Sequence, residues 1–561
     1  MPTTTIHDKT SVATLLLVAF LALLAPVNAS GNDRSVTLLP LALDERTLPQ
    51  LRVLLDLGLV DSEQLVRFYF ARMSALDDSG PRVNAMLDRV PDALERAREI
   101  DRHRHEDGHG PLYGIPFVVK DNIDVAGLPT SAGSMVLKGA YPQDSAHLVQ
   151  RLQAAGAILL GKANMTELAA SYGQPGYSSR GGITRNPWRL DRSVLGSSSG
   201  PAAAVAAGFA PFAIATDTEG SARGPAHATG LVTMRPTLGR ISRDGIMPLA
   251  MSFDTPAPLT RTVTGNAWVL AAMAGRDDDD SATGFNAQSP FQLRRALRPP
   301  AAGSRPLEGV KLGVIAHREM GNREIEARLE QVLERIRTLG GETVRAELNG
   351  YYQDLWPQVV GPVHEAEFEP QLARYLEQFG DDQPDNLSEL MALCKRFNSR
   401  AVVDHPIKKA RIKGMERRLD EHMAGSAAYL QVVSRRIPAL REELAGFMRD
   451  NDLDALIFPT EACPAPPLKG ERDQPYECSA DTPFSLGYIA SATGFPELSL
   501  PMGLTRAGVP INFSLLGTAR REARLYGIGQ AFMQALSKND PLALPGSAAQ
   551  RLDDDNGEKT P

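Results

Sequence analysis

Two serine-containing turns, at residues 196–200 and 216–221, combine residue types that can perform nucleophilic chemistry. The first reads Gly-Ser-Ser-Ser-Gly and directly precedes an alanine-rich helix predicted at 202–208. The second reads Thr-Asp-Thr-Glu-Gly-Ser, leaves a predicted strand and enters another helix. A glycine beside a serine at such a turn leaves backbone N–H groups free to face an anion, although serine is also an ordinary helix cap. Two such turns can converge at one end of an α/β sheet, where these sheets bind ligands.

Lys120 is the third residue with catalytic potential. It closes the apolar run at 117–119, and lysine is rarely buried without a task. Burial or a nearby like charge would lower its pKa by up to about 3–5 units and make it a neutral base near pH 7. The alternative is a lysine at a strand end whose stem lies along apolar surface while its ammonium stays in water.

Helices and strands alternate along the part of the chain that must position these residues. A helical pattern spans 44–76, a strand pair 111–125, a short amphipathic helix 145–155, and a buried strand follows at 157–160. The order predicts an α/β fold: a large mixed, mostly parallel twisted sheet covered by helices on both faces. We expect one domain at 30–545, with a core at about 75–265 and 450–540 and a helical layer at about 320–447. The tail at 546–561 has too little apolar content to order itself and is predicted to be disordered.

The motifs together resemble the amidase signature family. The matching segments are G-S-S-S-G-P-A-A-A-V-A-A-G from 196, T-D-T-E-G-S-A-R-G-P-A from 216, M-R-P-T-L-G-R-I-S from 234 and G-I-P-F-V-V-K-D-N from 114. The similarity extends over residues 45–540, and the segments at 177–188 and 242–248 look most like bacterial peptide amidases. The resemblance implies a serine amidohydrolase that uses an acyl-enzyme to hydrolyse peptide C-terminal amides or small amides.

Carried over position by position, the family's catalytic triad falls on Lys120, Ser197 and Ser221. The two serines are 24 positions apart, as the family pattern requires. The resemblance also implies a non-proline cis peptide at 196–198. The oxyanion hole would consist of the backbone N–H groups of Ser221 and the three residues before it. The remaining predicted site residues are the oxyanion donors Thr218, Glu219 and Gly220 and the supporting residues Ser198, Asp217 and Arg223.

Three positions near the predicted site depart from the family pattern. Leu195 replaces the first glycine of the serine-rich turn, Pro201 replaces a serine, and Glu219 replaces a glycine before the nucleophile. The Glu219 carboxylate would repel a negatively charged substrate group if it faced the pocket. The triad itself is intact, which favours an active enzyme.

Two alternative functions remain open at this stage. The 196–200 turn also matches G-x-S-x-G, the nucleophile elbow of α/β-hydrolases, which would make Ser198 the nucleophile of a Ser-His-Asp esterase. The chain lacks the downstream acid and histidine context of that family. The second alternative is an inactive exported binding protein that keeps the amidase fold, supported only by the three departures.

The N-terminus predicts export. An apolar run at 12–25, Pro26 and a small-x-small site ending at Ala29 are typical of a signal peptide at 1–29, cleaved after Ala29. The mature protein would then be periplasmic or secreted, without stable membrane insertion; the alternative is an uncleaved N-terminal anchor. Of three cysteines, Cys463 and Cys478 could pair and leave Cys394 free, although three buried thiols explain the count equally well.

Composition and motif searches limit the classes of ligand. A net charge of -7 with no basic stripe argues against nucleic acid as a partner. His364-Glu365 begins a metal-binding H-E pattern, but Phe368 stands where the second histidine belongs. We therefore expect no metal and no cofactor. The expected partner is a small-molecule or peptide amide, while the oligomeric state cannot be read from the sequence.

Overall fold

The computed structural model describes residues 42–106, 108–170, 174–285, 297, 305–316, 321–468, 476–544 and 546–557. The chain divides into two units, Met1–Ala42 and Leu43–Pro561. The predicted signal peptide and its cleavage site lie outside the described residues. Within the described ranges, no helix is both long and apolar enough to cross a membrane.

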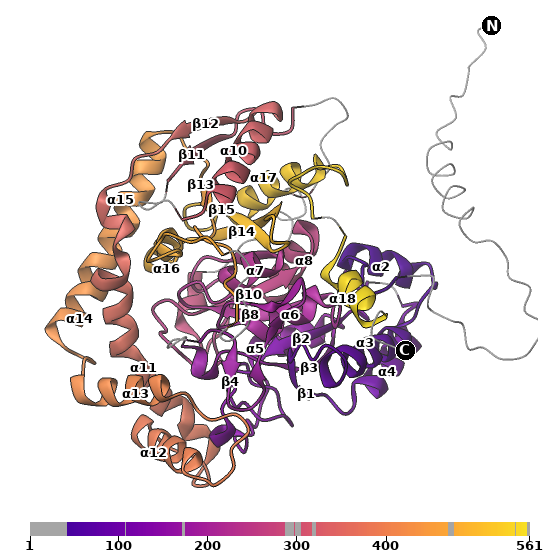
Figure 1. The fold of residues 1–561 in the computed structure, drawn as a ribbon, viewed down its shortest axis with the longest axis vertical. Coiled ribbons are helices and arrows are strands. Elements are labelled where there is room, and N and C mark those ends of the chain that lie inside the picture. Colours follow the sequence, from indigo (N-terminus) through magenta and orange to yellow (C-terminus); the bar gives the residue numbers. More distant parts are fainter. Residues whose placement is uncertain are drawn as a thin grey trace, which may run out of the picture. The chain divides into compact units, whose positions relative to one another are not determined.

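An eleven-stranded mixed sheet forms the centre of the second unit (Figure 1). Its strands follow the order β1-β3-β2-β8-β10-β9-β14-β15-β13-β11-β12. Two smaller sheets pair β4 (Tyr177–Ser178) with β5 (Gly182–Ile183) and β6 (Arg185–Asn186) with β7 (Arg189–Ser193). The strands of the large sheet are β1 (Met86–Arg89), β2 (Pro116–Lys120), β3 (Ile158–Ala163), β8 (Phe212–Asp217), β9 (Val232–Arg235), β10 (Thr255–Thr260), β11 (Lys311–Val314), β12 (Glu342–Arg345), β13 (Ala455–Pro459), β14 (Glu497–Leu504) and β15 (Pro510–Leu516).

The large mixed sheet is confirmed, but the prediction that most of its strands are parallel is wrong. Six of its ten neighbouring strand pairs are antiparallel. The parallel blocks are β3-β2-β8 and β13-β11-β12. Between them, β9 is followed by β10 and β14 by β15 without an intervening α-helix, and each of these pairs is antiparallel. A direct connection reverses the chain, whereas a parallel crossover needs a long connection such as a helix.

Helices cover both faces of the sheet, and their bounds differ from the predicted layers. Those before residue 340 are α2 (Leu48–Asp56), α3 (Ser62–Met73), α4 (Ala93–His103), α5 (His147–Ala154), α6 (Ser199–Ala206), α7 (Arg223–Thr229), α8 (Val263–Met273) and α10 (Arg323–Thr338). Later ones are α11 (Gly361–Leu376), α12 (Leu387–Asn398), α13 (Lys409–Glu421), α14 (Ala427–Gln431), α15 (Ile437–Asp450), α16 (Tyr488–Thr493), α17 (Glu522–Gln534) and α18 (Ala548–Gly557). Every residue of α6 and α7, the helices that follow the two serine turns, is buried.

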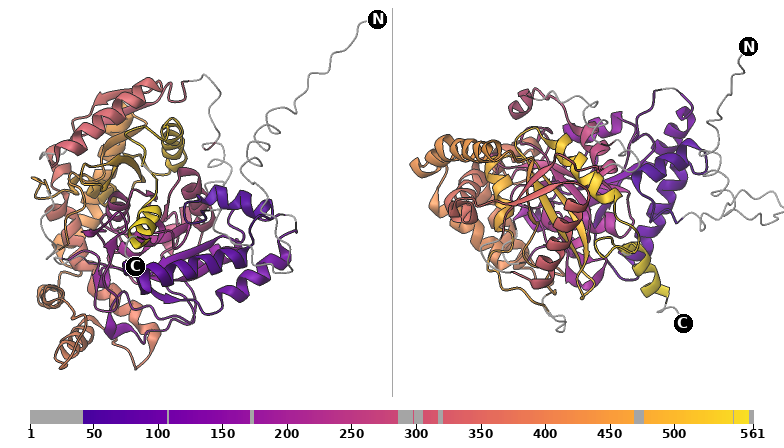
Figure 2. Two further views of the ribbon diagram at one scale, coloured as in Figure 1. Left: turned by 45° about the vertical axis from the view of Figure 1, so that its right-hand side comes forward. Right: turned by 90° about the horizontal axis from the view of Figure 1, so that it is seen from above.

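The predicted helical layer at 320–447 is shorter than expected. Helix α10 connects the sheet strands β11 and β12. The separate helical layer therefore consists of α11–α15 only. In Figures 1 and 2 these orange helices lie on the other side of the sheet from α2–α4. Two apolar clusters attach the layer: one includes Val363 and Leu444 with Phe458, the other includes Phe368 and Met165.

The C-terminal segment is ordered where the sequence predicts disorder. Helix α18 buries Ala548, Ala549 and Leu552, and Asp553 forms an ion pair with Arg72 at 2.9 Å. Three small or apolar residues on one helix face suffice here because the surrounding domain supplies the rest of the core. Composition alone therefore underestimates the order of a helix that packs against the rest of the domain.

Cys463 and Cys478 form a disulfide, with Cα atoms 5.4 Å apart, and Cys394 is a buried free thiol. The structure therefore decides between the two cysteine arrangements that the sequence left open. No cluster of three or more possible metal-ligating side chains occurs in the described part of the chain.

Candidate active site

Lys120 lies at the end of β2, between the parallel neighbours β3 and β8, and its side chain is fully buried. Its Nζ lies 2.7 Å from Ser197 Oγ and 2.8 Å from Thr216 Oγ1. Burial lowers the pKa of Lys120 to about 7, and the negative charges of Asp217 and Asp254 oppose the shift. The amine is thus held against Ser197 in a state that can accept a proton near neutral pH.

The first serine turn contains the cis peptide that the resemblance implies, between Gly196 and Ser197. The turn approaches Thr166 closely, since a Cβ on Gly196 would lie 2.3 Å from Thr166 Oγ1. The Ser198 N–H donates to the Ser221 carbonyl oxygen at 3.0 Å, which joins the two serine turns directly. Ser198 Oγ donates to the Thr216 carbonyl at 3.1 Å.

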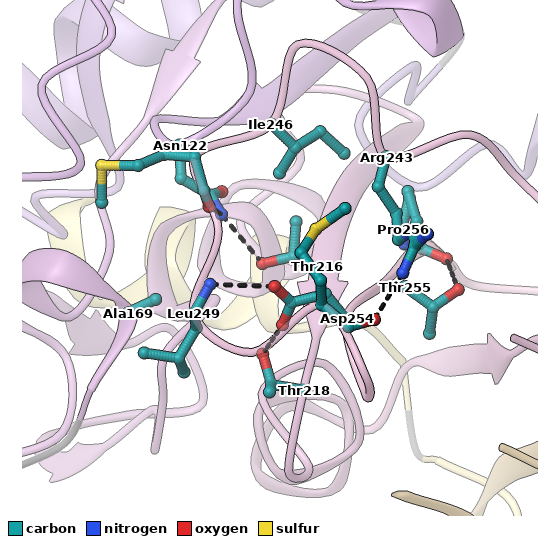
Figure 3. Close-up of a pocket in the computed structure, with 12 residues that line it drawn as sticks. Asn122, Ala169, Thr216, Thr218, Arg243, Ile246, Leu249, Asp254, Thr255 and Pro256 are labelled. Carbon is teal, nitrogen blue, oxygen red and sulfur yellow. Dashed lines mark hydrogen bonds between the residues drawn. The ribbon is translucent and has the colours of Figure 1, made fainter. Parts of the chain in front are cut away.

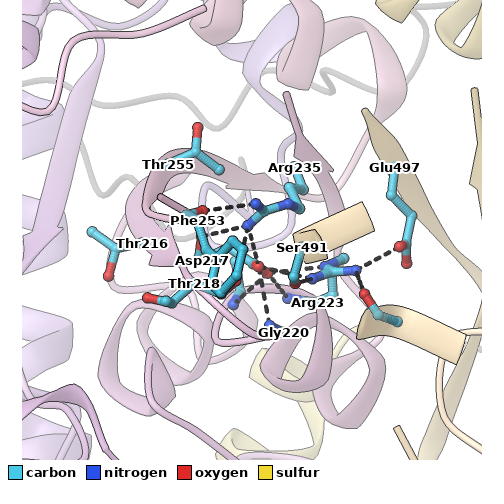
Figure 4. A network of polar contacts seen from close by, with 12 residues as sticks. Thr216, Asp217, Thr218, Gly220, Arg223, Arg235, Phe253, Thr255, Ser491 and Glu497 are labelled. Carbon is cyan, nitrogen blue, oxygen red and sulfur yellow. Dashed lines mark hydrogen bonds and ion pairs between the residues drawn. The ribbon is translucent and has the colours of Figure 1, made fainter. Parts of the chain in front are cut away.

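Asp217 organises the second serine turn (Figure 4). Its carboxylate accepts hydrogen bonds from the backbone N–H groups of Gly220, Ala222 and Arg223 at 3.0–3.2 Å. It also pairs with the Arg223 and Arg235 guanidinium groups at 2.9 and 2.8 Å. Burial alone would raise the pKa of Asp217, but the two arginines hold it well below its usual range. The loop that carries Ser221 is therefore wrapped around a permanently ionised carboxylate.

Arg223 connects this loop to the C-terminal half of the sheet. Its guanidinium pairs with Glu497 on β14 at 2.5 Å and donates to Ser491 Oγ at 3.1 Å. Figure 4 shows both contacts converging on the Arg223 side chain from α16 and β14. Arg223 thus joins the turn to residues more than 260 positions away in the sequence.

The backbone N–H groups of the predicted oxyanion hole divide into two sets. The Gly220 N–H is engaged by Asp217, which differs from the expectation that it faces the substrate. Thr218, Glu219 and Ser221 donate their N–H groups to no other described residue. Three donors therefore remain available to bind a negatively charged oxygen.

Glu219 points toward the helical layer and contacts α11. Its Oε1 lies 2.5 Å from His364 Nδ1, and the other ring nitrogen of His364 contacts Arg418 on α13. Arginine can only donate, so His364 Nε2 must accept and its proton must be on Nδ1, which donates to Glu219. The Glu219 carboxylate is thus hydrogen-bonded to the layer and turned toward it.

A cavity of about 10 Å³ is lined by Asn122, Thr216 and Asp254 among others (Figure 3), and it adjoins Lys120 through Thr216, whose Oγ1 contacts Lys120 Nζ. Asn122 donates to Thr216 Oγ1 at 3.2 Å, and Asp254 accepts from Thr218 Oγ1 at 2.5 Å. This volume holds at most about one water, and the Lys120 side chain itself is fully buried. Burial is what keeps the lysine pKa low.

Comparison with known proteins decides the family. The family model described as Amidase matches residues 64–526. The chain belongs to the amidase family. The α/β-hydrolase alternative is therefore wrong, and Ser198 is buried with its hydroxyl bound to a backbone carbonyl rather than exposed on an elbow.

Individual relatives cover nearly the whole amidase. The native peptide amidase of Stenotrophomonas maltophilia is 33% identical, with a TM-score of 0.76 over 89% of this chain and 98% of that one. An amidase family protein from Bacillus anthracis is 29% identical, with a TM-score of 0.76 over 91% and 96% of the two chains. A glutamyl-tRNA(Gln) amidotransferase subunit from Nitratidesulfovibrio vulgaris is 34% identical over 84% of this chain and 93% of that protein. The chain is an amidohydrolase with the amidase signature fold.

Two departures of this amidase from the family pattern have local explanations. Leu195 adopts a φ of 62°, in the left-handed region that favours glycine, and its N–H is held by Ser193 Oγ at 2.9 Å. Pro201 is the third residue of α6, where the backbone N–H has no partner within the helix. With both residues in place, Ser197 Oγ still lies 2.7 Å from Lys120 Nζ.

Sequence reasoning missed Thr216 as the second partner of Lys120, and His364 as the partner of Glu219. Thr216 stands in the matched motif, and its position at the strand end beside Asp217 was the available signal. His364 lies 145 residues from Glu219, and nothing in the local pattern links them.

Proposed function

We propose that the amidohydrolase uses Ser221 as nucleophile, Ser197 as proton shuttle and Lys120 as base. The observation that carries this assignment is the 2.7 Å contact between Lys120 Nζ and Ser197 Oγ in a buried site. The lysine pKa of about 7 supports it, because a neutral amine is available at neutral pH.

In the acylation step, Ser221 Oγ attacks the carbonyl carbon of the amide. Its proton passes to Ser197 Oγ, while the Ser197 proton passes to the lone pair of Lys120 Nζ. The C–N bond then breaks, and the proton returns through Ser197 to the departing nitrogen, which leaves as ammonia or an amine. Water attacks the resulting ester of Ser221 by the same route and releases the carboxylic acid.

The developing oxyanion would be bound by the backbone N–H groups of Thr218, Glu219 and Ser221. These donors are fixed before substrate arrives, because Asp217 holds the loop from inside. Loss of one donor in comparable sites costs roughly 10²–10³ in rate. The role of Gly220 in this proposal is to anchor the loop to Asp217.

Peptide C-terminal amides are the substrate class that we propose, with small amides next. The support is the similarity in fold and sequence to a peptide amidase over nearly the full length of both chains. The layer α11–α15 lies close to the site, since His364 of α11 contacts Glu219, and it can therefore shape the substrate pocket.

We also propose that the protein is exported. The Cys463–Cys478 disulfide supports an oxidising compartment, because such bonds are rare where thiols are kept reduced. Sequencing the N-terminus of the protein recovered from culture medium or periplasm tests the predicted cleavage after Ala29. An unprocessed N-terminus in the membrane fraction would favour the uncleaved anchor.

Ammonia release from a panel of amides tests the catalytic proposal. Peptide amides, aliphatic and aryl amides and a fatty amide are compared for wild type, Ser221→Ala and Ser399→Ala. Ser399 is an exposed serine at the end of α12 and serves as the matched control. We expect release by wild type and the control but not by Ser221→Ala. Retained release by Ser221→Ala removes the nucleophile assignment, and no release from any amide favours the inactive binding protein.

A further inference from the structure

Glu461, two residues after β13, is a carboxylate beside both serine turns that the proposed mechanism does not use. A Cβ built on Gly224 would lie 2.9 Å from Glu461 Oε1 and 3.9 Å from the carbonyl oxygen of Gly196. Gly224 follows the nucleophile Ser221 by three residues, and Gly196 directly precedes Ser197. The Glu461 carboxylate therefore lies against Gly224 at the start of α7, in space that the glycine leaves open, and the Gly196 carbonyl approaches the same glycine.

Glu461 has no ion-pair or hydrogen-bond partner among the residues that the structure describes. Burial raises its pKa to about 8, and no cation among the described residues counteracts the shift. Arg223 is committed to Asp217 and Glu497, and Arg192 pairs with Asp191 at 4.0 Å. The Glu461 residue is partly buried, so its carboxylate is partly removed from water while remaining open to a ligand. A positively charged ligand would offset the cost of this partial desolvation.

Two tyrosines, Tyr476 and Tyr488, lie within electrostatic range of Glu461. Burial raises the pKa of Tyr476 and of Tyr488, and the negative charge of Glu461 raises each further, so both hydroxyls are near this carboxylate. The Tyr488 ring lies 5.3 Å from the Trp356 ring and 5.4 Å from the Phe484 ring. Aromatic faces attract ammonium and guanidinium groups, and the Gly196 carbonyl oxygen adds a further partial negative charge.

The disulfide fixes this arrangement. Cys463 and Cys478 each follow one of the two residues, Glu461 and Tyr476, by two positions. Their bond therefore keeps the segment that carries Tyr476 next to the end of β13. The carboxylate and the ring are brought together by a covalent link rather than by the sheet alone.

We propose that Glu461 forms an anionic subsite, beside the nucleophile, that binds a positively charged ammonium or guanidinium group of the amide substrate. The inference rests on the proposed amide hydrolysis and narrows its substrate class to amides of basic molecules. A bound cation would pair with the carboxylate, contact the tyrosine rings and hold the scissile amide near Ser221.

Matched pairs of amides test this subsite. N-acetyl-lysine amide is compared with N-acetyl-norleucine amide, and N-acetyl-arginine amide with N-acetyl-citrulline amide. A leaving-group pair sets the 5-aminopentylamide of N-acetyl-leucine against its pentylamide. Values of kcat/KM are measured at about pH 9, where Glu461 is ionised and lysine side chains remain cationic. The enzymes are wild type, Glu461→Gln and Glu477→Gln, an exposed control that removes the same charge nearby.

We expect wild type to prefer the cationic member of at least one pair by roughly tenfold or more, as for a charge-assisted hydrogen bond. Glu461→Gln should lose this preference while it hydrolyses the neutral member at the wild-type rate, which also shows that it folds. Glu477→Gln should retain the preference. Hydrolysis without preference in any pair, or a preference that survives in Glu461→Gln, overturns the subsite and leaves the amidase function intact. If wild type hydrolyses no amide in the panel, both proposals fail.

Discussion

The rate of Ser221 acylation should follow the protonation of Lys120. With a pKa of about 7, half of the lysines are neutral at pH 7, about one in eleven at pH 6 and about one in a hundred at pH 5. Because only the neutral form can accept the Ser197 proton, kcat/KM for a neutral amide should fall about a hundredfold from its plateau to pH 5. A lysine with an ordinary pKa would instead place the same fall near pH 10.

Two assays measure this profile independently. One follows ammonia release from N-acetyl-norleucine amide, and the other follows the rate at which a sulfonyl fluoride labels Ser221, which needs no leaving nitrogen. Circular dichroism at pH 5 serves as the control that the protein stays folded there. Glu461→Gln should keep the same acid limb, since that carboxylate titrates about one unit higher. Lys120→Arg should be inactive throughout, because arginine cannot become a neutral base. A flat profile between pH 5 and 8, or an active Lys120→Arg, would refute the reasoning.

The other predictions concern stability and the loop. Lys120→Met should abolish activity yet raise the melting temperature at pH 7. The folded state binds the lysine proton less tightly than the unfolded chain, so the penalty is full below the folded pKa of about 7 and disappears above the unfolded value of 10.5. The advantage of the methionine variant should therefore shrink by pH 9, and an unchanged advantage would contradict the lysine pKa. Asp217→Asn should cost about 3–5 kcal/mol in urea unfolding, because it leaves buried Arg235 without a carboxylate and Arg223 with Glu497 alone, whereas the exposed control Asp450→Asn should change little. His364→Ala should lower kcat with little change in KM, and should have no effect in a Glu219→Gly background. Additive losses in that double-mutant cycle would show that the two residues act separately.

The residues proposed for catalysis lie in short, local patterns that can be read from the sequence. Lys120 ends an apolar strand, and the serine turns sit at the starts of helices, so sequence neighbours determine their placement. The contacts that set the pKa of Lys120, by contrast, come from residues far away in the sequence. Asp254 and Asp217 moderate the Lys120 pKa, and Asp254 comes from β10's N-terminal side, 134 residues away. Only the three-dimensional pairing of strands brings such groups together.

The same distinction explains the errors in the fold. Helix–strand alternation at about 145–216 agrees with the parallel pairing of β3, β2 and β8, but the inference of a mostly parallel sheet does not hold for β9, β10, β14 and β15, which connect without helices. Composition predicted disorder at 546–561, yet α18 gains its order from a surface elsewhere in the domain. Both errors concern interactions between segments that no local window contains.

The contact between Glu219 and His364 has a consequence for engineering this enzyme. Residue 219 belongs to the catalytic loop, whereas His364 belongs to the helical layer that would be exchanged to alter substrate range. In a chimera that received this layer from a relative without the histidine, the Glu219 carboxylate would lose its hydrogen-bond partner beside the proposed nucleophile. The loop and the layer should therefore be exchanged together. A graft of the layer alone would need glycine at position 219 or histidine at position 364.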